Sequence, residues 1–129
     1  MNVKFPRTNV GGISVSRLVI GTNWFLGFSH TSKAKDKFII ENIATRKKIA
    51  HILEVFLNHD IDTVIAPLRE ILIQAIKDAQ DRTGEKVILM STPAFPINKD
   101  TPVSGFCNDQ TKRILEQEAK SGASICMPH

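Results

Sequence analysis

Several polar side chains that could bind or transform a small molecule follow the predicted strands of this chain. The candidates for ligand binding are Thr22, Asn23, Trp24, His30, Ser91 and Thr92. His129, after the last predicted strand, is the candidate catalytic residue, because an imidazole can act as an acid, a base or a substrate ligand near neutral pH. Ligands of α/β proteins bind beyond the carboxyl ends of the strands, so we predict a site at that edge.

His30 lies in a long predicted loop together with three lysines, and this group could bind a small anionic or carbonyl ligand. The lysines are Lys33, Lys35 and Lys37. The alternative interpretation is a solvent-exposed loop without a ligand. The whole chain has 17 Lys and Arg residues against 13 Asp and Glu, a net charge of +4. A basic patch attracts phosphate groups, but no nucleic-acid-binding motif accompanies it, and we expect no nucleic-acid partner.

Motifs for phosphate loops, nucleophile elbows and zinc proteases do not occur in the sequence. Cys126 and His129 are three residues apart, so along one strand their side chains point to opposite faces and do not form a metal site. We therefore expect no bound metal, and the sequence leaves the identity of any cofactor open. The two cysteines are expected to be free thiols, as is usual in the cytoplasm.

A chain of 129 residues is long enough for one domain, and we expect residues 1–129 to form a single one. No apolar run approaches the ~18 residues that a transmembrane helix needs. The first residues also lack the apolar core of a signal peptide. These observations predict a cytoplasmic protein without a membrane partner.

The elements that would position the candidate residues are an amino-terminal hairpin followed by alternating strands and helices. Glycines at 11 and 12 predict a hairpin turn between strands at 3–5 and 13–15. The first long strand is predicted at 18–25, and a loop at 26–44 follows, with local helix at 35–42. This loop is long for a compact domain, which favours a lid or a binding loop.

Three helices and three further strands are predicted beyond this loop. The strands are 61–66, 86–91 and 123–127. Thr45 is predicted to cap the first helix, Pro67 to start the second, and Asn108 or Asp109 to cap the third. The last two helices end at Gly84 and Gly122. A second long loop, rich in proline, is predicted at 92–107.

Alternation of strands and helices gives a parallel sheet with right-handed crossovers, so the fold class is α/β. Two architectures satisfy this pattern: an open doubly wound sheet, and the first half of a TIM-type (β/α) barrel, whose full length is ~250 residues. The hairpin before the first parallel strand favours the barrel. The last predicted strand is followed by no helix, which also favours half of a barrel with four parallel strands and three helices.

The segment at 10–22, Val-Gly-Gly-Ile-Ser-Val-Ser-Arg-Leu-Val-Ile-Gly-Thr, resembles the amino-terminal segment of aldo/keto reductases and their barrel relatives. Those proteins begin with a hairpin, continue with a Val-Ser-Arg-Leu segment and enter a strand that ends in Gly-Thr. The resemblance implies a β/α barrel of which this chain is the amino-terminal half, in a reductase-like branch without the usual catalytic residues.

The resemblance also implies positions for catalytic groups, and most of these positions differ here. The family uses a Tyr as proton donor, an Asp and a Lys that tune it, and a His near the substrate carbonyl. This chain has no Tyr, and the expected Asp and Lys fall near Ile65 and Ala66 and near Thr92 and Pro93. Only His129 matches. The family holds its nicotinamide cofactor with late barrel loops, outside the matched part.

Three hypotheses about function follow. The first is a fragment of an aldo/keto reductase-like barrel, without conventional NADPH-dependent carbonyl reductase activity. The second is a small α/β module that binds a ligand or a protein partner. The third is a half-barrel that forms a homodimer through its exposed sheet edges, because unpaired strands invite pairing.

Overall fold

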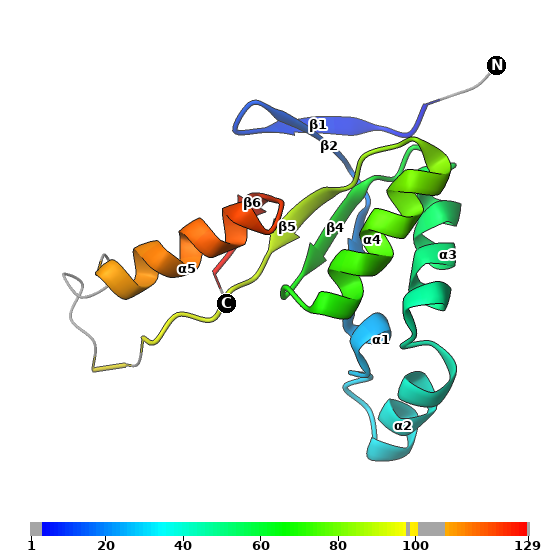
Figure 1. The fold of residues 1–129 in the computed structure, drawn as a ribbon, viewed down its shortest axis with the longest axis horizontal. Helices are drawn as coiled ribbons and strands as arrows, with labels where there is room; N and C mark the ends of the chain where they lie inside the picture. Colours follow the sequence, from blue (N-terminus) through cyan, green and yellow to red (C-terminus); the bar gives the residue numbers. More distant parts are fainter. Residues whose placement is uncertain (1–3, 98, 101–107, 129) are drawn as a thin grey trace.

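A four-stranded parallel sheet, with its strands in chain order, organises the fold (Figure 1). The computed structural model describes residues 4–97, 99–100 and 108–128. The strands are β3 (Val19–Gly21), β4 (Thr63–Ala66), β5 (Ile88–Ser91) and β6 (Ala123–Cys126). Their order is β3-β4-β5-β6, and all three neighbouring pairs are parallel. The predicted α/β class is confirmed.

The described part of the chain has five helices rather than the three predicted. They are α1 (Asn23–Leu26), α2 (Lys33–Asn42), α3 (Arg46–Leu57), α4 (Glu70–Thr83) and α5 (Asp109–Lys120). Helices α3, α4 and α5 connect successive strands as expected. The two other helices lie in the segment after β3: α1 was not predicted, and α2 includes the whole of the local helix predicted at 35–42. This long segment is therefore ordered as a pair of helices.

The prediction of a strand at 18–25 is wrong beyond Gly21. The backbone turns at Thr22, whose carbonyl accepts hydrogen bonds from the amides of Phe25 and Leu26. Gly27 then ends the short helix α1 with a φ of 86°, which a residue with a side chain adopts at a cost. An apolar run alone did not distinguish a strand from a strand followed by one helical turn.

The amino-terminal hairpin is confirmed, but its first strand is displaced from the predicted 3–5. Strand β1 (Arg7–Val10) pairs antiparallel with β2 (Ile13–Ser16). Gly11 and Gly12 form the turn, with φ of 56° and 85°. Because the two-residue turn fixes the register, Val10 must face Ile13, and the partner of 13–16 is therefore 7–10.

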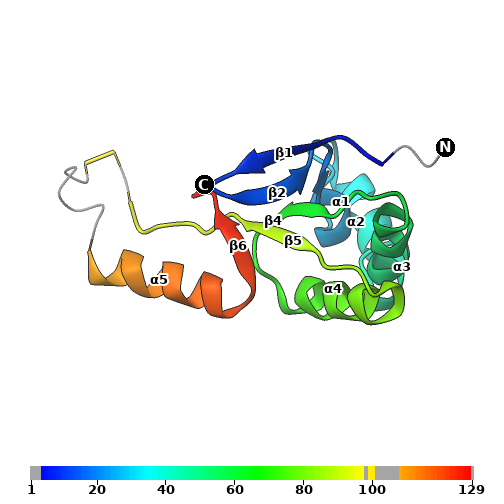
Figure 2. The ribbon, with the colours of Figure 1, turned by 90° about the horizontal axis from the view of Figure 1, so that it is seen from above.

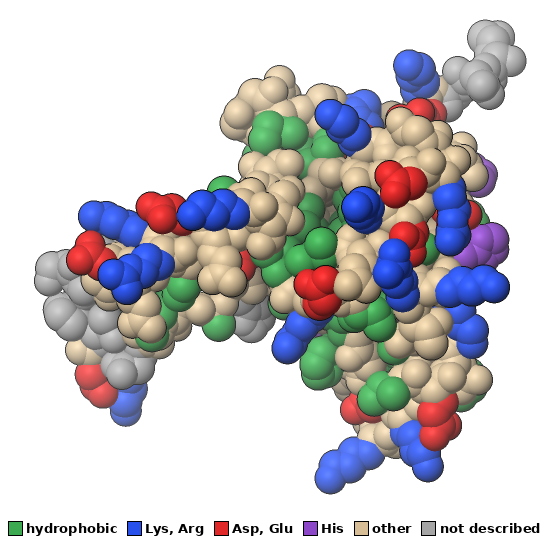
Figure 3. Space-filling model, in the orientation of Figure 1, with side chains coloured by type: hydrophobic (Ala, Val, Ile, Leu, Met, Phe, Trp, Pro, Cys, Tyr) green, Lys and Arg blue, Asp and Glu red, His purple; other side chains and the backbone are tan. Residues whose placement is uncertain are grey.

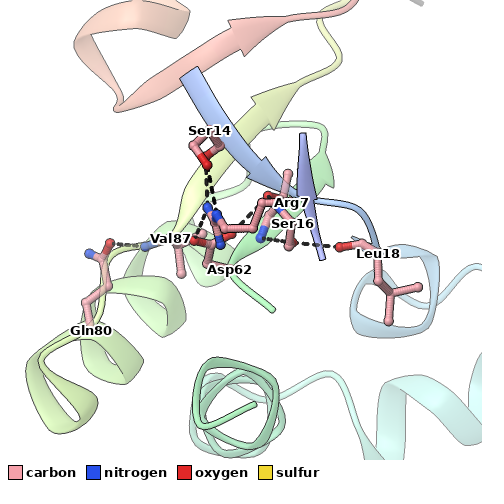
Figure 4. A network of polar contacts seen from close by, with 8 residues as sticks. Arg7, Ser14, Ser16, Leu18, Asp62, Gln80 and Val87 are labelled. Atoms are coloured by element: carbon pink, nitrogen blue, oxygen red, sulfur yellow. Dashed lines mark hydrogen bonds and ion pairs between the residues drawn. The ribbon is translucent and has the colours of Figure 1, made fainter. Parts of the chain in front are cut away.

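Polar contacts hold the hairpin at the amino end of the sheet (Figure 4). The Arg7 guanidinium donates to the Asp62 carboxylate, with 2.7 Å between Nη2 and Oδ2. Ser16 and Thr63 are both fully buried and exchange two hydrogen bonds: the Ser16 amide donates to Thr63 Oγ1 at 2.9 Å, and the Thr63 amide donates to Ser16 Oγ at 3.2 Å. The hairpin is thus held at the end of the sheet opposite the carboxyl ends of the strands.

Helices α3 and α4 cover one face of the sheet and form the core with it. The apolar faces of both helices pack against the sheet. The principal core residues are Ile20, Ile49, Leu53, Leu57, Val64, Leu72, Ala75, Ala79 and Leu89. Thr45 caps α3 as predicted, since its side chain accepts a hydrogen bond from the Lys48 amide.

Helix α4 begins at Glu70, and the prediction that it begins at Pro67 is wrong. Strand β4 ends at Ala66, directly before this proline. A helix beginning at Pro67 would leave no chain to cross from the sheet to the helix layer, a crossing that takes ~2–6 residues in βα connections. The predicted end at Gly84 is confirmed by its φ of 75°.

Helix α5 and strand β6 complete the described fold with far fewer buried side chains. Asn108 caps α5 by accepting a hydrogen bond from the Thr111 amide at 2.9 Å, as predicted. Helix α5 extends away from the other helices (Figure 1), and Thr111 is its only buried residue. The apolar side chain of Leu115 remains exposed.

Figure 2 shows α4 and α5 on one side of the sheet and the β1–β2 hairpin on the other. Core residues from α3 and α4 pack together against the same face, so all three crossover helices share one side. The strand order does not reverse within the described sheet, which is therefore not doubly wound. None of the described helices combines the length and the apolar character needed to cross a membrane.

Candidate functional site

Thr22 anchors the candidate site to the carboxyl end of the sheet. Its side chain is buried, and its hydroxyl donates to the Ile65 carbonyl of β4 across 3.1 Å. This bond fixes the point where the chain leaves β3 and enters α1. Asn23 and Trp24 follow directly and are exposed. These residues lie where β3 ends, four residues before the predicted end of the strand at residue 25.

Asn23 and His30 are brought together by α1 and the turn that follows it. The Asn23 amide nitrogen lies 2.9 Å from His30 Nε2. An amide nitrogen can only donate, so this contact is a hydrogen bond in the tautomer whose Nε2 accepts and whose Nδ1 carries the proton. His30 itself has a φ of 56°, an unusual conformation for a residue with a side chain. The imidazole is exposed and can contact a ligand.

Asp36 holds the turn that positions His30. Its Oδ1 accepts hydrogen bonds from the Ser29 amide at 2.7 Å and from the Ser29 hydroxyl at 2.6 Å. The Ser29 hydroxyl and then its amide lower the pKa of Asp36 below its ordinary value. Ser32 caps α2 by accepting from the Lys35 amide. Short-range hydrogen bonds thus order a segment whose composition predicted a loop.

Trp24 and Lys35 form the second contact of this region. The Lys35 ammonium nitrogen lies 5.3 Å from the centroid of the Trp24 ring, within the range of a cation–π interaction. The Trp24 side chain is 45% exposed, so its indole remains accessible. We name Thr22, Asn23, Trp24, His30 and Lys35 the β3-end cluster. It presents an amide, an imidazole, an ammonium group and an aromatic surface to solvent.

Ser91 and Thr92 lie at the end of β5 but are not part of the same cluster. Ser91 is fully buried, and its hydroxyl has no hydrogen-bond partner among the described residues. It pairs in register with Ala66, which belongs to the core beneath the helices. Thr92 is partly exposed, and its amide donates to the Ala66 carbonyl at 3.0 Å. Thr22 and Thr92 therefore bind consecutive carbonyls of β4.

The predicted ligand-binding residues Thr92 and Trp24 line two separate hollows. Thr92 lines a groove of about 520 Å³ between the start of α4 and helix α5, together with Arg69 and Glu118. Trp24 lines a different hollow of about 320 Å³ beside β3 and α3. Figure 3 shows hydrophobic side chains gathered between α5 and α4. The structure thus unites the residues after β3 and separates them from those after β5.

The sequence did not single out Arg69 or Glu118. Arg69 follows β4 at the carboxyl edge, and the rule that ligands bind there could have found it. Glu118 lies within α5, where nothing in the sequence distinguishes it from other surface carboxylates. One of its carboxylate oxygens, Oε2, is inaccessible to solvent and has no hydrogen-bond partner among the described residues.

His129 and Cys107 lie outside the described residues. The amide of Met127 donates to the Ser91 carbonyl at 2.8 Å, and the chain is described as far as residue 128. Cys126 is a partly buried free thiol. Within the described part of the chain, no group of three His, Cys, Asp or Glu side chains is placed to hold a metal ion.

The positions where the reductase resemblance places an Asp and a Lys carry no ionisable group. Strand β4 ends in Ile65 and Ala66, and β5 is followed by Thr92 and the buried Pro93. Neither a protein-family model nor a curated protein nor a solved structure matches this chain. The chemistry of the site is therefore inferred from its own residues.

Proposed function

We propose that this chain forms four strands and three crossover helices of an aldo/keto reductase-like β/α barrel and binds a small anionic or carbonyl ligand at the β3-end cluster. The single observation that carries the proposal is the position of Asn23, Trp24, His30 and Lys35 at the carboxyl edge of an unreversed parallel sheet. In β/α barrels this edge carries the active site.

The arrangement of the elements supports the barrel. Strands in chain order with their crossover helices on one side are what a β/α barrel requires, and the hairpin covers the amino end. The side chains on the other face of the sheet include Val19, Ile65, Met90 and Ile125, which share that face by register. Bulky and branched side chains of this kind fill barrel interiors.

The chemistry of the β3-end cluster supports the ligand class. His30 Nδ1–H and the Lys35 ammonium are hydrogen-bond donors on exposed side chains, and Trp24 adds an apolar surface. An ammonium group and a neutral N–H both donate hydrogen bonds to carboxylate, phosphate or carbonyl oxygens, and the charged donor makes the stronger bond. We do not include hydride transfer in the proposed function, because the sequence has no Tyr to donate the proton.

Trp24 supplies a direct test of ligand binding. It is the only tryptophan, and the chain has no tyrosine. The fluorescence emission of the protein, excited in the near ultraviolet, therefore reports on this cluster. We expect pyruvate or inorganic phosphate to change the emission in a saturable titration. Lys35→Met should weaken that binding by about tenfold, or ~1.4 kcal/mol, because a charge-assisted hydrogen bond is lost.

The matched control is Lys112→Met, which removes an exposed lysine from α5 and should leave the titration unchanged. A parallel assay with NADPH and pyruvate should show no oxidation of NADPH. The ligand proposal is overturned if neither compound changes the emission, or if both lysine variants bind as the unmodified chain does. Measurable oxidation of NADPH would overturn the absence of reductase activity.

A further inference from the structure

Both ends of the parallel sheet are unpaired in the described part of the chain. Strand β3 pairs only with β4, and β6 pairs only with β5. Neither β3 nor β6 contains a charged residue or a proline. Proteins commonly protect edge strands with such residues, because a free edge offers its backbone groups to another strand. The two edges are therefore suited to pairing.

Apolar side chains are exposed beside the free edge of β3. Leu18 and Val19 are 46% and 38% exposed, and together with Trp24 they line the hollow of about 320 Å³. On the other free edge, Met127 directly follows β6 and is 45% exposed. A parallel pairing of β6 with β3 aligns their carboxyl ends, so it would bring Met127 to the level of Trp24. Methionine sulfur and aromatic rings attract one another.

We propose that a second copy of this chain covers both edges, with β6 of each copy pairing in parallel with β3 of the other. Two such contacts, related by a twofold axis, close a barrel of eight strands from two sheets of four. This inference rests on the half-barrel architecture of the proposed function. A second copy is the occupant that the structure favours, because each edge finds its complement on the same molecule.

Sedimentation equilibrium and the variant Val19→Lys test the dimer. The unmodified chain should have twice the monomer mass, and a lysine at position 19 should give a monomer, because its charge would be buried at the contact. Val10→Lys is the matched control: Val10 is also an exposed strand valine, but it lies in the hairpin. This control should stay dimeric. Circular dichroism establishes that both variants are folded.

A cross-linking experiment identifies which edges meet. Every protein carries Cys107→Ser, so that Cys126 is the only native thiol. Leu18→Cys should then allow a bis-maleimide to join position 18 of one copy to Cys126 of the other, because both side chains lie on the helix side of the sheet. Adding Cys126→Ser should abolish the covalent dimer. A dimer that persists without Cys126 would mean that β3 meets β3, and would overturn the proposed pairing.

Trp24 emission separates failure of the dimer from failure of the proposed function. If the unmodified chain is a monomer at every concentration, the dimer inference is overturned. Ligand-dependent emission from that monomer would then leave the ligand-binding function intact. Conversely, a dimer that is cross-linked through Cys126 but gives no response to pyruvate or phosphate supports the interface and contradicts ligand binding.

Discussion

Helices α3 and α5 have the same length of 12 residues but bury very different amounts of apolar surface. On α3, Ile49, Ala50, Leu53 and Leu57 are buried against the sheet and α4. On α5, Thr111 alone is buried, and Leu115 is 39% exposed. An amphipathic sequence therefore determines that a helix forms, while the neighbouring elements determine whether its apolar face is covered.

Ion pairs also distinguish α3 from α5. The Arg46 guanidinium of α3 donates to both carboxylate oxygens of Asp78 in α4, at 2.7 and 2.6 Å. Arg82 of α4 also pairs with Glu54 of α3. No ion pair joins α5 to another helix among the described residues. The packed pair of helices and the extended α5 should therefore respond differently to substitution.

The largest expected difference is between Leu53→Ala and Leu115→Ala. Leu53 is fully buried in the core, so its truncation should lower the free energy of unfolding by about 2–5 kcal/mol. Leu115→Ala should lower the free energy of unfolding by no more than about 0.5 kcal/mol, because this side chain is exposed. Urea unfolding followed by circular dichroism measures both.

Each leucine variant serves as the control for the other, because the same atoms are removed from two helices of equal length. A loss at Leu115 as large as that at Leu53 would contradict the comparison, since it would mean that α5 is packed in solution. Repeating the measurement with the Val19→Lys monomer distinguishes packing within one copy from packing between two copies.

Most of the elements could be predicted from the sequence because their signals are local. The caps at Thr45 and Asn108, the helix end at Gly84 and the glycine turn of the hairpin all act over a few residues. The helix within 18–25 could not be predicted, because an apolar run has no periodicity that separates a strand from a single helical turn.

The candidate site was predictable in part for the same reason. The sequence placed a parallel strand at this point of the chain, but Asn23 and Trp24 lie after the end of β3 and not within it. The contact of Asn23 with His30 depends on how α1 and α2 turn, and the division between Trp24 and Thr92 depends on long-range packing. Neither is encoded in the spacing of these residues.

Gly27→Ala and Gly122→Ala should have smaller effects on stability. Gly27 lies between α1 and α2, Gly122 lies between α5 and β6, and both glycines have a left-handed backbone. Gly27 has a φ of 86°, and an added Cβ would lie 2.7 Å from Ile40 Cγ1. Gly122 has a φ of 97° and open space around it. In both variants, backbone strain should lower the free energy of unfolding by about 1–2 kcal/mol. Gly27→Ala should lower the free energy of unfolding by about 1 kcal/mol more, because the added Cβ crowds the contact between α1 and α2.

Urea unfolding measures both glycine variants, and Trp24 emission reports whether α1 has moved. Equal losses at the two glycines would mean that Ile40 shifts freely, and that the α1–α2 corner is no better packed than the start of β6. A change in Trp24 emission for Gly27→Ala alone would place the strain at the candidate site.

The smallest expected effect comes from Asp78→Asn, which removes the ion pair between α3 and α4. The Arg46 guanidinium lowers the pKa of Asp78 below its ordinary value of 3.8, first by hydrogen bonding and then by its charge. A lowered pKa in the folded state stabilises the protein above the unfolded pKa, and that contribution is lost as the pH falls through the folded value. Asp78→Asn should therefore reduce stability slightly at neutral pH and by less in acid.

Asp81→Asn, on the same helix, is the control, because the described structure records no ion pair for Asp81. Urea midpoints at about pH 7 and about pH 3 give the comparison. The difference between the two variants should be present at the higher pH and shrink at the lower one, because the stability that Asp78 contributes falls once the pH is below its unfolded pKa. A difference that is the same at both values would mean that Asp78 acts through hydrogen bonding that survives protonation, and that charge does not hold α3 to α4.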